Sequence, residues 1–195
     1  FIYLHITRGE ADRDYVYSDA LKPNVFAFSQ ETVSGKADAP VSGVSMKSHP
    51  DLRWKRRDIK TSNLLGQVIA KTAAARAGAY EALMVDDEGF VTEGGATSFF
   101  IIRDKTLLAR PVTNEILHGI TRQTMLRVAE ALGYAIETRR VTLAEALAAD
   151  EAFLTGASSY VEPVVEIDGQ PIGSGVPGDF TMRLRKAYLQ AVRSA

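Results

Sequence analysis

A run of cationic residues, Arg53 to Lys60, contains the side chain best suited to nucleophilic chemistry. It reads Arg-Trp-Lys-Arg-Arg-Asp-Ile-Lys, and Lys60 comes directly before an expected helix start at Thr61-Ser62. A lysine amine among other cations, near the positive end of a helix dipole, is expected to have a lowered pKa. Such an amine is a nucleophile that can form a Schiff base with a carbonyl compound. A solvated face with one buried Trp, or an isolated nucleic-acid patch, would have the same composition.

A second candidate is the carboxylate of Glu93, in the segment Thr92-Glu93-Gly94-Gly95 that follows an expected strand. The paired glycines allow the backbone to approach another group closely. A carboxylate at such a strand end could hold a positively charged ring nitrogen. A surface hairpin fits the same residues and is the interpretation that the local sequence favours.

Two further segments have the groups that cradle a phosphate without a Walker lysine. One, Gly119 to Arg122, opens an expected helix, and the other, Thr155 to Ser159, is a small polar turn after an expected strand. Both offer backbone N–H groups and hydroxyls, which are the donors that bind phosphate. Ordinary helix caps have the same composition, so neither segment decides the question alone.

Other motifs are weaker. The segment Gly173 to Gly178 matches G-x-G-x-x-G, but a dinucleotide site needs a following βαβ unit and an acid about 20 residues on. We expect a connector turn there, because the chain ends soon after it and Pro177 stiffens it. The three histidines, His5, His49 and His118, lack metal-ligand spacing, so we expect no metal site.

The composition is that of an ordinary folded protein. The chain has 195 residues, 46% of them hydrophobic and 24% charged, with 23 Lys and Arg against 24 Asp and Glu. This balance argues against a disordered chain and gives no global field that would favour nucleic acid. The absence of cysteine excludes disulfides, thiolate nucleophiles and Cys-type metal sites in this sequence. No apolar stretch reaches the length of a membrane span. We expect a cytoplasmic protein.

The elements that must position these residues alternate irregularly between strands and helices. Helices are expected at Ser62 to Gly78, with Leu65, Val68, Ile69 and Ala73 on one face, at Thr121 to Leu132, after a Thr142 capping box, and at Phe180 to Ser194 with Asp179 as its cap. Strands are expected at Phe1–Ile6, Val25–Phe28, Glu81–Val85, Phe90–Thr92, Ser98–Ile102, Leu107–Leu108, Ala152–Thr155 and Val164–Ile167. This order predicts an α+β fold.

The chain opens inside a strand, so we expect residues upstream of Phe1 that this sequence lacks. Ser34 to Pro50 is rich in glycine and proline and is the best linker candidate. We therefore expect residues 1–35 to be the remnant of a small N-terminal α/β domain, with a linker near 34–40. Residues 36–195 would form a nearly complete large domain.

Taken in order, these pieces resemble the fold-type IV pyridoxal-phosphate (PLP) enzymes of the class IV aminotransferase family, most of all the D-amino-acid transaminases within it. No single piece decides the resemblance, which depends on many pieces in register. They are Ile6–Gly9, Arg53-Trp54, Asp58-Ile59-Lys60, Asn63–Leu65, Gly78–Ala82, Thr92-Glu93-Gly94, Asn114–Leu117, Gly119–Arg122 and Val164–Gly169.

The resemblance implies a role for each candidate. Lys60 would form the aldimine, a Schiff base with PLP, and then move the proton between the substrate's Cα and the cofactor. Glu93 would pair with the pyridine nitrogen and keep the ring an electron sink. The remaining cofactor-binding residues would be Leu117 against one ring face, Ile120, Thr121, Gly156, Ala157 and Ser158 around the phosphate, and Arg53.

The resemblance also implies a substrate site. Arg13 stands where D-amino-acid transaminases place the arginine that traps the substrate carboxylate, a sound bidentate contact. Tyr15 stands where that trap usually has His and is the second substrate-binding candidate. Two other departures from the family pattern are Ala157, in place of a phosphate-binding Thr or Ser, and Ser98, in place of Asn.

The function implied is transfer of an amino group between a D-amino acid of the D-alanine or D-glutamate type and a 2-oxo acid. The family makes a homodimer the expected assembly, with small molecules as its partners and neither nucleic acid nor membrane. A PLP lyase of the aminodeoxychorismate lyase type, or a branched-chain or (R)-amine transaminase, would use the same Lys60 and Glu93. A non-catalytic or nucleic-acid-binding fragment using Arg53 to Arg57 is the alternative from another class.

Overall fold

The structure is a computed structural model that describes residues 1–31, 37 and 39–194. The chain divides into two compact units, Phe1–Lys36 and Ala37–Ala195. In the first unit, strand β1 (Ile2–Thr7) pairs antiparallel with β2 (Asn24–Ser29), as the apolar runs in the sequence predict. Of the predicted linker at 34–40, residues 34–36 and 38 lie outside the described residues.

The second unit is built on one mixed sheet. Its described strands follow the order β5-β4-β3-β10-β9-β6-β7-β8, with β11 beside β10. β3 runs parallel to both β4 and β10, and β7 runs parallel to β8, while the other pairs are antiparallel. The strands are β3 (Val44–Pro50), β4 (Glu81–Val85), β5 (Val91–Gly94), β6 (Ser98–Arg103), β7 (Thr106–Ala109), β8 (Ala135–Thr138), β9 (Glu151–Gly156), β10 (Tyr160–Ile167) and β11 (Gln170–Pro171).

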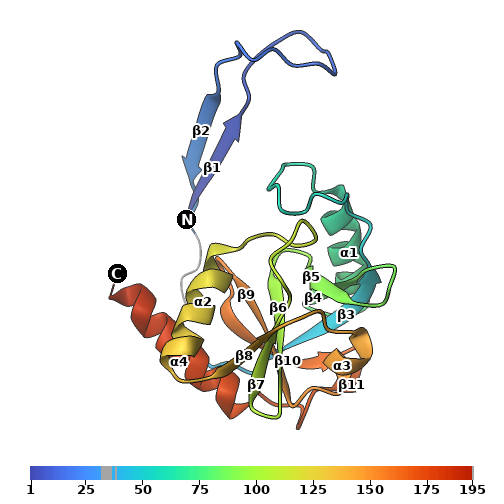
Figure 1. Cartoon of the computed structure of the whole chain (residues 1–195), viewed down its shortest axis with the longest axis vertical. Coiled ribbons are helices and arrows are strands. Elements are labelled where there is room, and N and C mark those ends of the chain that lie inside the picture. The colour runs from blue at the N-terminus through green and yellow to red at the C-terminus, as the bar shows by residue number, and fades with distance from the viewer. Residues whose placement is uncertain (32–36, 38, 195) are drawn as a thin grey trace. The chain divides into compact units, whose positions relative to one another are not determined.

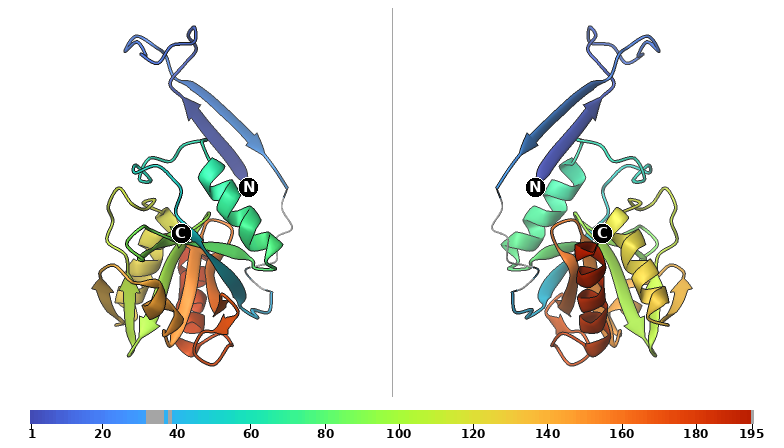
Figure 2. Two further views of the ribbon diagram at one scale, coloured as in Figure 1. Left: turned by 90° about the vertical axis from the view of Figure 1, so that its right-hand side faces the viewer. Right: turned by 90° about the vertical axis from the view of Figure 1, so that its left-hand side faces the viewer.

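Helices cover this sheet, as Figure 1 shows. Helix α1 (Leu65–Arg76) packs on β3 and β4, while α2 (Ile120–Ala131) and α4 (Asp179–Arg193) pack on each other and on β9. Figure 2 shows α1 and α4 along different parts of the sheet. The short helix α3 (Leu143–Leu147) packs its apolar side chains onto the core of β6 and β9. No helix among the described residues is long and apolar enough to cross a membrane.

Both faces of the central strands are buried. Along β6, Phe99 and Ile101 enter one core cluster while Phe100 and Ile102 enter another, because successive side chains point to opposite faces of a strand. Phe100 stacks on Phe153 of β9 with ring centroids 5.0 Å apart. Strands covered on both faces are continuously apolar, which explains the run Phe-Phe-Ile-Ile in β6. The mixed α+β fold predicted from the sequence is confirmed.

The predicted helix at Ser62 to Gly78 is confirmed in part, but its start and its buried face are wrong. α1 begins at Leu65, and Leu64 caps it without a side-chain hydrogen bond. The buried side chains are Ala70 and Ala74, which pack against Ala82 and Met84 of β4. Small alanines let the helix lie close to the sheet, so the larger Leu65, Val68 and Ile69 are exposed.

Three strands were not expected from the sequence. β3 lies within the predicted linker Ser34 to Pro50, whose later part is therefore a strand inside the sheet. β3 contains Lys47, Ser48 and Pro50, and its place is decided by parallel pairing with β4 and β10 rather than by an apolar pattern. β8 is an edge strand beside β7, and β11 has two residues.

The N-termini of α3 and α4 are capped in different ways. α3 has the predicted capping box, in which Thr142 and Glu145 exchange side-chain and backbone hydrogen bonds. The prediction that Asp179 caps α4 is wrong, since Gly178 occupies the cap position. The carboxylate of Glu151 in β9 instead accepts hydrogen bonds from the Phe180 amide at 3.0 Å and from the Thr181 amide at 2.8 Å. A distant carboxylate thus replaces the local cap.

This arrangement gives a stability prediction. Glu151→Ala removes the acceptor for the first amides of α4 and for the Thr181 hydroxyl, so we expect the free energy of unfolding to fall by about 1–3 kcal/mol. The matched control is Asp179→Ala in the first turn of the same helix, which should cost less than about 1 kcal/mol. Urea denaturation measures both, and an equal or larger loss for the Asp179 variant would contradict the assignment.

Candidate functional site

A pocket of about 1140 Å³ opens in the second unit. Its wall is made by the loop before α1, the end of β5, the start of α2 and the turn after β9. The pocket therefore brings together segments that lie far apart in the sequence. The predicted site residues that line it are Arg53, Lys60, Glu93, Leu117, Ile120, Thr121, Gly156 and Ala157.

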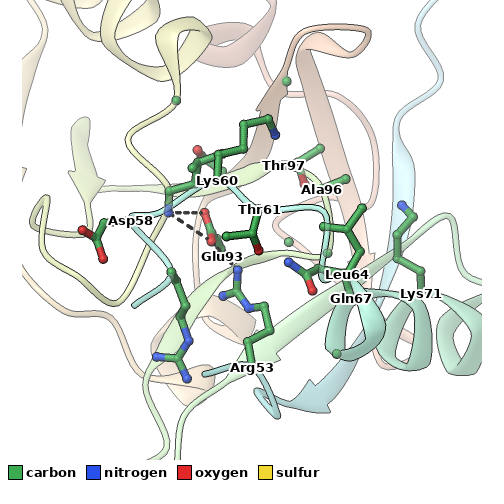
Figure 3. A pocket seen from close by; sticks show the side chains of 18 of the residues that line it. Arg53, Asp58, Lys60, Thr61, Leu64, Gln67, Lys71, Glu93, Ala96 and Thr97 are labelled. Carbon is green, nitrogen blue, oxygen red and sulfur yellow. Dashed lines mark hydrogen bonds and ion pairs between the residues drawn. The ribbon is translucent and has the colours of Figure 1, made fainter. Parts of the chain in front are cut away.

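Glu93, at the end of β5, is a buried carboxylate that lines this pocket. Its side chain is 6% exposed. Arg53 Nη1 donates to Glu93 Oε1 at 2.6 Å, and the Leu117 amide donates to both carboxylate oxygens at 3.2 Å (Figure 3). The predicted alternative of a surface hairpin is therefore wrong for this residue, since the carboxylate faces inward and is held from two other segments.

Arg53 is itself held by Asp51. Arg53 Nε donates to Asp51 Oδ1 at 2.9 Å, and Arg53 Nη2 donates to Asp51 Oδ2 at 2.7 Å. The Thr92 hydroxyl also donates to Asp51 Oδ2 at 2.7 Å, and Arg57 Nε lies 3.3 Å from it. The result is a buried line of alternating charges behind the pocket wall, in which Arg53 bridges two carboxylates.

Burial and charge act against each other in this line. Burial raises the pKa of the Glu93 carboxyl above its usual value, although the charge and hydrogen bond of Arg53 and the Leu117 amide favour the ionised form. Burial acts in the same direction on Asp51, but there the hydrogen bonds and charge of Arg53, helped by Thr92 and Arg57, bring the pKa below its usual value.

The arginine run is divided by these contacts. Arg53 and Arg57 turn inward to Asp51, while Arg56 forms an exposed ion pair with Asp58 at 2.8 Å. The run is therefore not the continuous solvated face that was one interpretation of its composition. The expectation of a buried tryptophan there is also wrong, because Trp54 is 55% exposed.

Lys60 is an exposed residue of the loop that lines the pocket. Figure 3 shows it in the same pocket as Glu93. The predicted helix start directly after Lys60 is wrong, since Thr61 to Asn63 continue the loop and Leu64 caps α1. Lys60 thus reaches the pocket from a loop rather than from a helix end.

The start of α2 and the turn after β9 are on the same pocket. Gly119 caps α2 without a side-chain hydrogen bond, which leaves the first amides of the helix, at Ile120 and Thr121, for other acceptors. Gly156 is close-packed, because a Cβ there would lie 3.2 Å from Thr97 Cγ2. Ser158 follows in the turn and is exposed. A helix N-terminus of this kind is a favourable place for a phosphate.

These groups suit PLP in their donor chemistry. The buried carboxylate of Glu93 can hold a protonated ring nitrogen, the α2 start can hold a phosphate, and Lys60 supplies an amine. Gly95 packs closely in the pocket wall, since a Cβ there would lie 2.6 Å from Lys71 Cγ. Together their chemistry fits a pocket for PLP.

Comparison with known proteins agrees with a PLP-dependent enzyme. The family model for class IV amino-transferases matches residues 2–167, and the chain belongs to this family. It is 39% identical over 193 residues to a D-alanine aminotransferase of Bacillus licheniformis, in a match that covers 99% of the chain and 68% of that protein. A D-alanine aminotransferase of Staphylococcus aureus strain N315 is 33% identical over 194 residues, with the same coverage.

The solved structure of a branched-chain amino acid aminotransferase from Thermobaculum terrenum, in its PLP-form, is 28% identical with a TM-score of 0.84. It matches 99% of this chain and 64% of its own, so the chain spans less than two thirds of that enzyme's length. Class IV aminotransferases use PLP. The predicted family, fold type and cofactor are confirmed.

Arg13 and Tyr15 belong to the other compact unit, in the segment between β1 and β2. Arg13 Nη2 donates to the Tyr15 hydroxyl at 3.0 Å, and Tyr15 is 89% exposed. The two substrate-site candidates are thus in contact with each other. Their role stays a prediction.

Sequence reasoning missed Asp51, which holds Arg53, and the contacts of Thr92 and Arg57 with Asp51. It also missed the buried Arg122 of α2, whose Nη2 donates to the Arg110 carbonyl and whose pKa is lowered by burial. The only sequence signal was proximity, since Asp51 precedes Arg53 by two residues and Thr92 precedes Glu93 by one.

The burial of Glu93 predicts a pH dependence. Its folded-state pKa lies above the ordinary value of 4.5, so the folded protein holds this proton more tightly than the unfolded chain does. Stability from that proton is complete below pH 4.5 and is lost as the pH rises through the folded-state pKa. In cofactor-free protein, Glu93→Gln should therefore gain stability relative to wild type as the pH rises.

The matched control has the opposite sign. The pKa of Glu115 is lowered, chiefly by a hydrogen bond from Arg110, so its stabilisation is present above pH 4.5 and is lost as the pH falls. Wild type should therefore lose stability relative to Glu115→Gln on acidification. Urea denaturation at a series of pH values below and above 4.5 tests both predictions. If the free energy of unfolding depends on pH in the same way for wild type and Glu93→Gln, the prediction for Glu93 is contradicted.

Proposed function

We propose that this chain forms the cofactor-binding part of a PLP-dependent transaminase. It moves an amino group between a D-amino acid of the D-alanine or D-glutamate type and a 2-oxo acid. The observation that carries the proposal is the buried ion pair of Glu93 and Arg53 in a pocket shared with Lys60 and the start of α2. The relatives named D-alanine aminotransferase support the choice of substrate.

When bound, PLP supplies an electron-poor ring that stabilises negative charge at the substrate's α-carbon. Glu93 would hold a proton at the ring nitrogen through its carboxylate, and Leu117 would be the apolar neighbour of the ring. Lys60 would act first as the nucleophile that holds the cofactor and then as the base, since its Nζ could take a proton from the substrate's α-carbon and return it.

The start of α2 and the turn after β9 would hold the phosphate end. The amides of Ile120 and Thr121 and the Thr121 hydroxyl would donate to it at the positive end of the helix. Gly156 and Ala157 would contribute backbone from the turn after β9, where Ala157 offers no hydroxyl and Ser158 follows with one.

The substrate carboxylate is bound by Arg13, with the Tyr15 hydroxyl beside it. A guanidinium can hold a carboxylate through two parallel hydrogen bonds. A phenol adds a donor but no charge, so recognition of the carboxylate depends chiefly on Arg13.

A second candidate is branched-chain amino acid transamination. It is favoured by the solved structure from Thermobaculum terrenum, which is that of a branched-chain amino acid aminotransferase. That enzyme is 28% identical to this chain, against 39% for the D-alanine aminotransferase of Bacillus licheniformis, so sequence similarity supports the D-amino acid first. An aminodeoxychorismate-type lyase or an (R)-amine transaminase would use the same Lys60 and Glu93.

A half-reaction screen tests these alternatives. Full-length protein loaded with PLP is mixed with D-alanine, D-glutamate, L-leucine, (R)-phenylethylamine or aminodeoxychorismate, and loss of the resting cofactor absorbance is followed. We expect D-alanine and D-glutamate to react fastest and to yield one equivalent of their 2-oxo acid. Lys60→Ala should slow the reaction by about 10²–10⁴-fold or more, because the acid–base group is lost.

The control is Lys55→Ala, an exposed lysine of the same loop, which should react at the wild-type rate. Faster reaction with L-leucine would move the assignment to branched-chain substrates. Pyruvate released from aminodeoxychorismate without an amino acceptor would move it to the lyase. Normal turnover by Lys60→Ala would remove Lys60 from the mechanism.

We also propose that the protein is a cytoplasmic homodimer. The support for a dimer is an exposed apolar surface along the start of α1 and the loop before it. This α1 surface consists of Trp54, Ile59, Leu64, Leu65, Val68 and Ile69, each at least 42% exposed, and all six also line the pocket. Exposed apolar side chains that gather on one helix and its loop are typical of an interface between protein chains.

The dimer proposal predicts the effect of a charge on this surface. Val68→Lys should raise the dissociation constant of the dimer by about tenfold or more, because a charge would be buried in the interface. The matched control is Val192→Lys on α4, a similarly exposed valine on another helix. Sedimentation measures both, and a monomeric wild type, or equal effects of the two variants, would contradict the proposal.

A further inference from the structure

Arg53 lies between the carboxylates of Asp51 and Glu93 in the buried line of charges. All three side chains are nearly inaccessible, with 0%, 7% and 6% of their surface exposed. Asp51 occupies Nε and Nη2 of the guanidinium, which leaves Nη1 for Glu93. The outer nitrogens of Arg53 are therefore used by carboxylates.

We propose that Arg53 is a positioning residue that keeps Glu93 ionised and aimed at the ring nitrogen of the cofactor, and that Asp51 locks Arg53 for this task. The inference rests on the proposed function, in which Glu93 is the partner of that nitrogen. It differs from the sequence-based expectation that Arg53 binds the cofactor directly.

The first step in the argument is electrostatic. The charged groups that face Glu93 are Arg53, Asp51 behind it and Arg122 from α2, and the Leu117 amide donates to the carboxylate. Arg53 is the group in direct contact, while Asp51 repels. Without Arg53, the carboxylate would keep the Leu117 amide and the charge of Arg122, whose Nη2 donates elsewhere, against burial and the negative charge of Asp51. Its pKa would therefore rise and it would more readily take up a proton.

The second step concerns what a protonated Glu93 can do. A neutral carboxyl group cannot stabilise a positive charge on the ring nitrogen, and the ring then loses much of its capacity as an electron sink. The loss falls on the chemical step rather than on binding of the amino donor. The expected signature is thus a lower kcat with little change in KM.

The third step explains Asp51. A free arginine side chain has many rotamers, whereas the two hydrogen bonds from Arg53 to Asp51 and the contacts of Asp51 with Thr92 and Arg57 hold the guanidinium in one orientation. A phosphate that took the Nη1 hydrogen bond of Arg53 would take it from Glu93 and weaken that ion pair. The geometry therefore favours Glu93 as the target of Arg53.

The test compares Arg53→Gln and Arg53→Lys with Arg56→Gln, an exposed arginine of the same loop whose loss should change nothing. In full-length protein without added PLP, carbon NMR follows the titration of the Glu93 carboxyl. We expect its pKa to move up by about 1–3 pH units in Arg53→Gln and less in Arg53→Lys. An unchanged Glu93 titration in folded Arg53→Gln would overturn the proposal.

A second readout uses the loaded protein and does not depend on the titration. We expect Arg53→Gln to lower kcat by about 10²-fold. The double variant Arg53→Gln/Glu93→Gln should be no slower than Glu93→Gln alone, because both changes remove the same interaction. Additive losses, with weaker PLP binding in both backgrounds, would show that Arg53 binds the phosphate and would overturn the proposal.

If Arg53→Gln does not fold, Asp51→Asn serves in its place, since it leaves Arg53 present but weakens its anchor. Asp51→Asn should lower kcat less than Arg53→Gln does, and it should cause no further loss when it is combined with Glu93→Gln. Additive losses of kcat in that double variant would overturn the role of Asp51. The proposed function fails separately. Normal turnover by Glu93→Gln would contradict the proposed function, while the NMR titration would still decide what Arg53 does.

Discussion

The carboxylate of Glu93 is a negative charge in the buried wall of a pocket, and the surrounding structure has to make that charge tolerable. An unpaired ionised carboxylate in such a place is strongly disfavoured and would be neutralised by a proton. Arg53 and the Leu117 amide supply the opposing donors, and Asp51 holds Arg53 in turn. Breaking a buried pair of this kind by removing one partner is more damaging than never forming it.

The mixed sheet makes this arrangement possible. β5 ends with Glu93 facing the pocket, while the loop after β3 brings Asp51 and Arg53 to the same place because β3 lies beside β4, next to β5. β6 and β9, covered on both faces, form a packed centre from which the start of α2 and the Gly156 turn reach the pocket. Site residues on loops are thus positioned by a packed scaffold.

Helix α1 has one face that packs on the sheet and another that is exposed. The alanines of the helix pack on β4, which leaves the larger apolar side chains of the α1 surface beside the pocket or in solvent. If every apolar residue of α1 packed against the core of this chain, Leu65 and Val68 would be buried, whereas both are exposed. Their exposure is consistent with a second protein surface covering them, as a homodimer would provide.

The sequence by itself determined the family and the cofactor, and it singled out several residues that line the pocket, because the motifs around Lys60, Glu93, Gly119 and Gly156 occur in register. It also determined β6, α2 and the Thr142 capping box, where local patterns agree with the fold. Other features depend on contacts between distant segments, which no local pattern encodes. Pairing with β4 and β10 makes β3 a strand, Glu151 of β9 caps α4, and close packing on β4 selects the alanine face of α1. Only the tertiary structure showed that Arg53 is bound by Asp51 and Glu93, since the charge state of a buried group depends on its neighbours in space.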